Sequence, residues 1–322
     1  MKEISIKDIE NIKIGNATDA ENATGCTVII CEKGAPTGVD VRGGGPASRE
    51  TPLLDPRAAS TDVHAVVLGG GSAYGLAAAG GVMNYLEEKG IGYPVPTGVV
   101  PLVVQSDIFD LTCGNSKVRP DEAMGYDACK NAEEGNFRDG CYGAGTGATV
   151  GKLKGMDNCT KTGIGSFAIQ LGELKVGAIV SLNALGNIYD TEGRCIAGVI
   201  DDERKGFISS VDLMCQLYEA TAKVKEVEFA GNTTIGVIIT NAAFDKAKMN
   251  KVAAMGHNGY ARAINPVHTS ADGDTIYAMS VGDVIADHDL VGTLGAQVMQ
   301  KAIERAVEAA ESSYGLTAAR DL

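Results

Sequence analysis

Residues 231–240 read Gly-Asn-Thr-Thr-Ile-Gly-Val-Ile-Ile-Thr, and this stretch carries the clearest structural signal in the chain. Residues 234–240 form a continuous apolar run of the kind found in strands that are buried on both faces. Such a strand needs a packed layer on each side. The run therefore predicts the interior of a layered α/β protein.

The segments around this run predict a mixed order of helices and strands. Downstream we expect a helix over residues 243–263, a strand over 275–280 and a helix from 290 to about 312 with an apolar stripe. Upstream, consecutive strands are expected over residues 148–150, 166–170, 175–182 and 195–199. Nearer the start, the sequence predicts strands 25–31 and 38–41 joined by a turn at 33–36, then a strand over 63–68, a helix ending near 90 and a helix over 120–132.

This order decides between two architectures. Strict alternation of strand and helix, which favours a doubly wound parallel sheet, is absent. A layered α/β sandwich with a mainly antiparallel sheet fits better. Because we find neither a low-complexity linker nor a repeat of 20–50 residues, we expect one domain over residues 1–322.

The composition and the charge limit the partners and the cellular location that we expect for this protein. The formal net charge is −13, and such a field repels phosphate backbones, so nucleic acid is not an expected partner. The N-terminus lacks a signal-peptide pattern, and no apolar stretch approaches the length of about 20 residues that spans a bilayer. The eight cysteines include no Cys-x-x-Cys pair, which indicates reduced thiols. We expect a cytoplasmic protein with no membrane partner.

A glycine-rich segment suggests a cofactor site and the histidines suggest a metal site, but neither has the pattern that such a site needs. Residues 143–148 (Gly-Ala-Gly-Thr-Gly-Ala) loosely match a dinucleotide-binding loop, but a turn precedes them and a strand-like segment follows, where the motif needs a strand and then a helix. The four histidines lie apart and form no His-Glu-x-x-His pair. The sequence therefore predicts neither a cofactor nor a metal.

The junction of Asn232 and Thr233 offers a chemistry of its own. If the Thr233 hydroxyl attacked the Asn232 carbonyl, an N-to-O acyl shift and hydrolysis would leave Thr233 with a free α-amine that can act as its own base. Asp272 and Asp274, at the entrance to a predicted strand, could orient that amine. The alternatives are an ordinary turn before a strand for the first segment and a solvated turn for the second.

Several motifs occur in an order that resembles one enzyme family. They are residues 42–46 (RGGGP), 68–76 (LGGGSAYGL), 108–111 (IFDL), 143–149 (GAGTGAT), 232–234 (NTT), 263–269 (AINPVHT) and 272–274 (DGD). Together they resemble the DmpA-type aminopeptidases, which include L-aminopeptidase/D-esterases, β-peptidyl aminopeptidases and nylon-oligomer hydrolases. The similarity runs from about residue 14 to the end of the chain.

The resemblance implies a four-layer αββα sandwich, similar in its layers to N-terminal-nucleophile (Ntn) hydrolases but different in connectivity. It implies self-cleavage into residues 1–232 and 233–322, with Thr233 as nucleophile and Asn232 supplying the cleaved carbonyl. Asp274 matches the family's acidic partner, and Asp272 its companion. The resemblance also implies a homotetramer or a larger assembly.

Two further site residues follow from the same resemblance. Asn183 matches the amide that stabilises the oxyanion, and Lys152 matches the family lysine, although Lys154 lies two residues away. Phe109 is a departure, because some members have Tyr in this stretch.

We therefore expect a hydrolase that cleaves amide bonds in small peptides, amino-acid amides or ω-amino-acid oligomers through an acyl-enzyme on Thr233. The alternatives are an unprocessed small-molecule binding protein or inactive relative, and an acyltransferase of the ornithine acetyltransferase kind.

Overall fold

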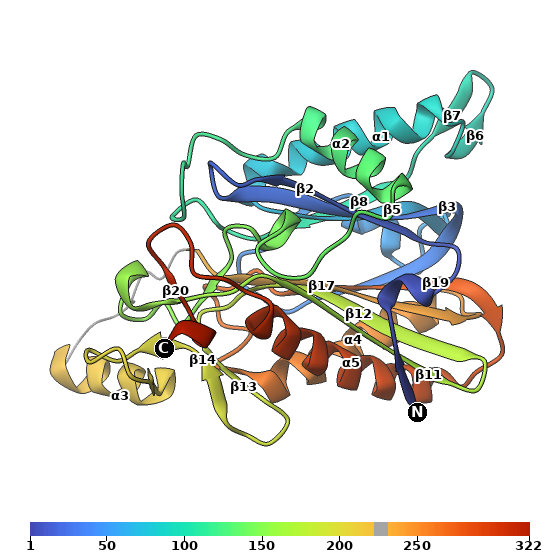
Figure 1. Ribbon diagram of the computed structural model, residues 1–322. Helices are drawn as coiled ribbons and strands as arrows, with labels where there is room; N and C mark the ends of the chain where they lie inside the picture. The colour runs from blue at the N-terminus through green and yellow to red at the C-terminus, as the bar shows by residue number, and fades with distance from the viewer. Residues whose placement is uncertain (222–230) are drawn as a thin grey trace.

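In the computed structural model, the chain folds into four stacked layers. The structure describes residues 1–221 and 231–322. Helices α1 (Ala78–Glu88) and α2 (Glu122–Glu133) cover one side, and α4 (Lys246–Ala263) and α5 (His288–Glu308) cover the other (Figure 1). Two β layers lie between them. The expected αββα sandwich is confirmed.

The strands of both β layers form one continuous hydrogen-bonded order, β1-β11-β12-β17-β19-β3-β5-β8-β4, with β2 paired to β3. Only the pairs β17–β19 and β5–β8 are parallel within this order, so the sheet is mainly antiparallel as expected. Its strands are β1 (Lys2–Ile4), β2 (Lys13–Asp19), β3 (Thr24–Val41), β4 (Ala47–Arg49), β5 (Asp62–Gly69), β8 (Val103–Asp107), β11 (Ile164–Leu171), β12 (Leu174–Asn183), β17 (Thr233–Ala242) and β19 (Thr275–Val284).

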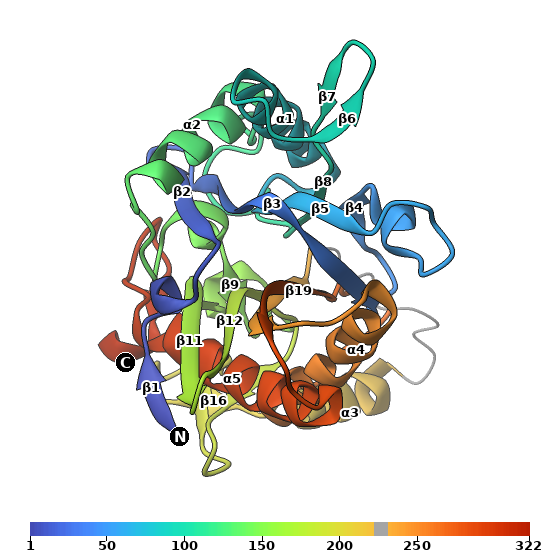
Figure 2. The same cartoon turned by 90° about the vertical axis from the view of Figure 1, so that its right-hand side faces the viewer.

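Strand β3 corrects one prediction. The two expected strands are a single strand that pairs with β5 in one layer and with β19 in the other, and Figure 2 shows it crossing between the layers. The expected turn is a register shift between Ile30 and Ala35, where Gly34 has φ +78°. A glycine at positive φ inside a bulge bends a strand without reversing it.

Strand β17 lies between β12 and β19, and every residue in it is buried. Ile235, Val237 and Ile239 pack in the core between the two β layers, while Ile238 packs in the core beneath α4 and α5. The predicted interior strand is therefore confirmed, and its alternating side chains join two of the cores.

Asx caps set the starts of the two long helices. The Asp245 side chain accepts a hydrogen bond from the backbone N–H of Lys248, so α4 begins at Lys246 and not at residue 243. Asp287 caps the backbone N–H of Leu290 in the same way. An aspartate at the N-cap satisfies an N–H that has no partner within the helix.

Smaller elements complete the described chain. They are β6 (Tyr93–Val95), β7 (Gly98–Val100), β9 (Thr149–Val150), β10 (Thr160–Lys161), β13 (Asn187–Tyr189), β14 (Cys195–Ala197), β15 (Val199–Ile200), β16 (Phe207–Ile208), α3 (Ser210–Thr221), β18 (Ile264–Asn265) and β20 (Thr317–Ala318). Along residues 1–221 and 231–322, every helix is too short or too polar to cross a bilayer.

Candidate active site

The site forms where the end of β12 lies beside the start of its antiparallel neighbour β17. Thr233 is the first residue of β17 and pairs in the antiparallel register with Asn183, the last residue of β12. Both side chains are buried. The end of a paired strand fixes the backbone but leaves side chains free to reach into the loops around it, as catalytic groups require.

The peptide bond before Thr233 is held from two sides. The Thr233 hydroxyl donates a hydrogen bond to the carbonyl oxygen of Asn232, and the backbone N–H of Gly273 donates to the same oxygen at 3.2 Å. Two donors on one carbonyl oxygen polarise the bond and are placed to stabilise negative charge on that oxygen. The side-chain amide of Asn232 is buried and makes no hydrogen bond in the described chain.

Lys152 reaches this cluster from the loop after β9. Its ammonium group donates to Asn183 Oδ1 at 2.7 Å, to the Asn183 carbonyl at 3.1 Å and to the Gly231 carbonyl at 2.9 Å. Burial lowers the pKa of Lys152 to about 8. Lys154, the other candidate, instead pairs with Asp202 at 2.5 Å near the surface. The structure thus places Lys152, and not Lys154, beside Asn183.

The amide of Asn183 has both ends fixed. Its Oδ1 accepts from Lys152 and from the backbone N–H of Thr149 at 3.1 Å. Its Nδ2 donates to the Phe109 carbonyl at 3.0 Å and to the Gly231 carbonyl at 3.4 Å. Together with the Thr149 hydroxyl, which also donates to Oδ1 at 3.4 Å, these donors leave Nδ2 as the end that faces carbonyl oxygens near Thr233, which is the orientation an oxyanion donor needs.

Asp272 and Asp274 flank Gly273 on the loop before β19, and both are buried. Asp274 Oδ1 accepts from the backbone N–H of Thr234 at 2.8 Å. One oxygen of Asp272 accepts from the hydroxyl of Thr269 at 2.5 Å. Burial, reinforced by the neighbouring Asp274 carboxylate, raises the pKa of Asp272 to about 6.

Glycines allow the backbones around this loop to approach closely. A Cβ on Gly43 would lie 2.3 Å from the backbone nitrogen of Asp274, and one on Gly273 would lie 2.8 Å from Thr233 Oγ1. Gly231 has φ +108°, and a Cβ there would lie 2.7 Å from the Phe109 ring. Residues 42–46 therefore support the backbone of the aspartate loop through hydrogen bonds such as Gly45 N–H to the Asp272 carbonyl, and the close approach requires glycine at position 43.

The structure brings all the predicted site residues into one cluster: Thr233, Asn232, Asn183, Lys152, Asp272 and Asp274. Sequence reasoning did not assign roles to Gly273, Thr149 or His268, which contact members of this cluster through backbone or imidazole groups. Two signals could have indicated His268: its place in the motif 263–269 (AINPVHT) and its closeness in sequence to Asp272 and Asp274. Within the described residues, His, Cys, Asp and Glu nowhere gather in groups of three or more that could hold a metal ion.

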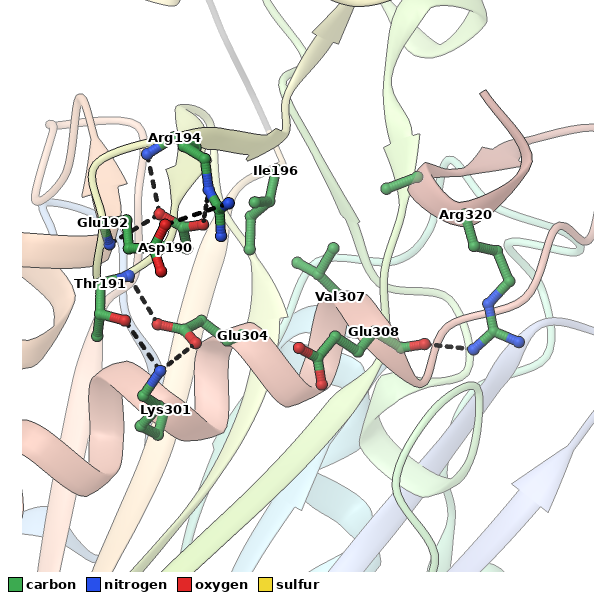
Figure 3. Close-up of a pocket in the computed structure, with 11 residues that line it drawn as sticks. Asp190, Thr191, Glu192, Arg194, Ile196, Lys301, Glu304, Val307, Glu308 and Arg320 are labelled. Atoms are coloured by element: carbon green, nitrogen blue, oxygen red, sulfur yellow. Dashed lines mark hydrogen bonds and ion pairs between the residues drawn. The ribbon is translucent and has the colours of Figure 1, made fainter.

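A hollow of about 470 Å³ lies apart from this cluster, and none of the site residues lines it (Figure 3). The loop around Asp190, the α5 side chains Lys301 and Glu304, and Arg320 near the C-terminus form its walls. Its charges pair with one another: Arg194 contacts Asp190 at 2.7 Å, and Lys301 contacts Glu304 at 2.6 Å. None of the predicted catalytic residues lies in this hollow.

Comparisons with known proteins identify the family of this chain. The model of peptidase family S58 matches residues 5–320. A Mycobacterium leprae protein described as an uncharacterized aminopeptidase is 37% identical over 97% of this chain and 92% of its own length. The 6-aminohexanoate-oligomer endohydrolase of Agromyces sp. is 34% identical over 86% of this chain and 75% of its own.

Solved structures show the same fold at lower identity. The L-aminopeptidase D-Ala-esterase/amidase from Ochrobactrum anthropi, described as a new variant of the Ntn hydrolase fold, superposes with a TM-score of 0.73 at 18% identity, over 98% of this chain and 90% of that one. A Burkholderia sp. β-aminopeptidase superposes with a TM-score of 0.67 at 18% identity, over 97% and 88%. The expected layering and its Ntn-like class are confirmed.

Proposed function

The chain belongs to peptidase family S58, and on that premise we propose that it frees its own nucleophile by cutting between Asn232 and Thr233. Family membership makes it an enzyme that hydrolyses amide bonds. The observation that carries the proposal is the hydroxyl of Thr233, which lies against the carbonyl oxygen of the preceding peptide at the start of the central strand.

The self-cleavage step needs only groups within this cluster and one water. Thr233 Oγ attacks the Asn232 carbonyl carbon, and the Gly273 N–H stabilises the oxygen that becomes negative. The C–N bond then breaks, the nitrogen takes up the hydroxyl proton, and an ester joins Asn232 to Thr233 Oγ. Water hydrolyses that ester, which leaves a carboxylate on Asn232 and a free α-amine on Thr233.

Substrate hydrolysis then uses the new amine. The α-amine, with an unperturbed pKa of about 8, accepts the Thr233 hydroxyl proton as Oγ attacks a substrate amide. Asn183 Nδ2 donates to the oxyanion, and Lys152 holds the opposite end of that amide. Asp272 and Asp274 orient the amine. The leaving amine departs with the proton, and water hydrolyses the acyl-enzyme.

For substrates we propose small peptides, amino-acid amides or ω-amino-acid oligomers. The relatives support this range: one is described as an aminopeptidase, and the Agromyces enzyme acts on 6-aminohexanoate oligomers. We further propose that the active form contains residues 1–232 and 233–322 and assembles as a homotetramer or larger.

A substrate panel tests the proposal. The purified protein is incubated with L-amino-acid p-nitroanilides, a β-peptide and a 6-aminohexanoate oligomer, and released amine is measured. We expect turnover of at least one class and, by mass spectrometry, an acyl group on the fragment that begins with Thr233. An added amine acceptor distinguishes transfer from hydrolysis. An acyl group found on another residue would contradict the assignment of Thr233.

A further inference from the structure

His268 is the one histidine that contacts the aspartate loop in the described chain. Its Nδ1 lies 2.8 Å from Asp274 Oδ2, and its backbone N–H donates to the same oxygen at 3.1 Å. The other oxygen of Asp274 accepts from the backbone N–H of Thr234, the residue after the nucleophile. A single buried carboxylate thus connects His268 to the start of β17.

The surroundings of the imidazole indicate which form it takes. His268 Nε2 is buried and has no hydrogen-bond partner. In an imidazolium that nitrogen would carry an N–H with no acceptor, whereas in the neutral tautomer with its proton on Nδ1 only a lone pair is unmatched. Because Asp274 can only accept when ionised, the neutral tautomer with Nδ1–H satisfies the pair.

Several charged and titratable groups lie around the imidazole of His268. From α4, His257 contacts the His268 ring edge-on at 4.7 Å between centroids, and Tyr260 lies beyond it at 6.1 Å. Burial lowers the pKa of His257 to about 4, so His257 is neutral at pH 7. The groups on the other elements packed here are Asp40 and Arg42 at the end of β3 and the pair Asp272 and Asp274.

The next residue makes a parallel contact. Thr269 donates from its backbone N–H and its hydroxyl to Asp272 Oδ2. Two consecutive residues therefore hold the two carboxylates on either side of Gly273, whose N–H faces the carbonyl of Asn232. Rotation of the Asp274 side chain would break its hydrogen bond to the backbone N–H of Thr234 at the start of β17.

We propose that His268 is a positioning residue for the function proposed above: as a neutral Nδ1–H donor, it fixes the Asp274 carboxylate and thereby aligns the Thr233 end of β17. It acts through Asp274 and does not touch the substrate. Both self-cleavage and substrate turnover depend on it.

Two variants of nearly equal size distinguish the loss of the hydrogen-bond donor at position 268 from a change in side-chain shape. His268 has φ +57°, a left-handed conformation that Asn and Asp tolerate better than other non-glycine residues. His268→Asn keeps an N–H donor near the Nδ1 position, whereas His268→Asp places an acceptor there, facing Asp274. His288→Asn, at a histidine on the first turn of α5, is the matched control.

The readouts are the self-cleavage rate, and kcat and KM normalised to the processed fraction. We expect His268→Asn to retain kcat within about threefold and His268→Asp to lose about 10- to 100-fold in kcat and in the cleavage rate, with KM changed little, as for loss of a hydrogen bond to a charged group. The melting temperature reports on folding. Equal activity in both variants, or an equal loss in both, overturns the inference.

A spectroscopic measurement tests the contact independently of activity. In Thr233→Ala protein with 15N-labelled histidine, NMR should show His268 neutral at pH 7 with the proton on Nδ1, and Asp274→Asn should shift that resonance. A proton on Nε2, or on both nitrogens, would overturn the inference. If the wild-type protein neither cleaves itself nor hydrolyses an amide while this NMR signature is present, the proposed function fails and the His268 contact stands.

Discussion

The Thr233 cluster and the Asp190–Arg320 hollow are both polar, yet they differ in how their polar groups are held. In the hollow, charged side chains pair with one another, as the exposed side chains of Arg194 and Glu192 do. In the Thr233 cluster, polar groups are buried, face backbone carbonyls and have pKa values displaced by burial. The comparison teaches that buried polar groups around one peptide bond, and not cavity volume, distinguish the candidate active site.

The largest expected effect is at the nucleophile itself. Thr233→Ala should abolish self-cleavage and amide hydrolysis, because no other group in the described cluster can form the ester. Thr233→Ser keeps a hydroxyl and should still cleave. Gel electrophoresis and an amide-hydrolysis assay measure both. Cleaved Thr233→Ala protein would contradict the comparison at its strongest point.

The next effect concerns the oxyanion donor. Asn183→Ala should lower kcat by about 10²- to 10³-fold, the usual cost of removing one such donor, when rates are normalised to the processed fraction. Asn241→Ala is the matched control, because Asn241 is also buried but lies at the other end of β17, where it contacts Glu173. An unchanged kcat in Asn183→Ala would remove Asn183 from the mechanism.

A smaller effect is expected in the acid limb of the pH profile of kcat/KM. Because the pKa of Asp272 is raised to about 6, its carboxylate form falls to about one-tenth at pH 5. This loss should lower kcat/KM about tenfold more between pH 7 and pH 5 than protonation of the Thr233 α-amine alone would lower it. Asp272→Asn should lower kcat/KM and flatten this limb. Asp190→Asn, in the hollow, should leave the limb in place; a limb that persists in Asp272→Asn belongs to another group.

The same group makes an opposite contribution to stability. The pKa of Asp272 is about 6 in the folded protein and about 3.9 unfolded. The folded state therefore binds this proton more tightly, and the stability from Asp272 is fully present below about pH 4 and lost as the pH rises through 6. Urea unfolding of wild-type and Asp272→Asn protein between pH 4 and 7 measures the difference. A parallel pH dependence in the two proteins would contradict the raised pKa.

The smallest effect is expected in the hollow. Glu192→Ala removes an exposed ion pair with Arg194 and should lower the free energy of unfolding by less than about 1 kcal/mol, while kcat changes less than about twofold. Denaturant unfolding and the substrate assay measure the two quantities. A large loss of activity here would show that the hollow serves the reaction after all.

Sequence reasoning predicted the parts of this molecule that have a regular apolar pattern or that resemble a family. The apolar run of β17 identified the interior strand, and the ordered motifs led to Thr233, Asn183 and Lys152. It failed at β3, where a glycine and a proline suggested a turn. A bulge and a turn use the same residue types, and only the pairing of β3 with both β5 and β19 distinguishes them.

The contacts that hold the site were harder to predict than its reactive groups. The Phe109 carbonyl and the Gly273 N–H are backbone groups, so no side-chain pattern marks them. His268 lies six residues before Asp274, and the backbone turn that brings them together has no periodic signal. Side-chain chemistry is visible in a sequence, whereas the backbone donors and acceptors around it depend on tertiary structure.

The mass of the purified wild-type protein under denaturing conditions tests the central claim most directly. Scaling 33.2 kDa by 232 and 90 of the 322 residues gives about 24 and 9 kDa. We predict two chains of these sizes, with Thr233 as the first residue of the smaller. A single chain of 33.2 kDa that stays intact on long incubation would contradict self-cleavage at Asn232.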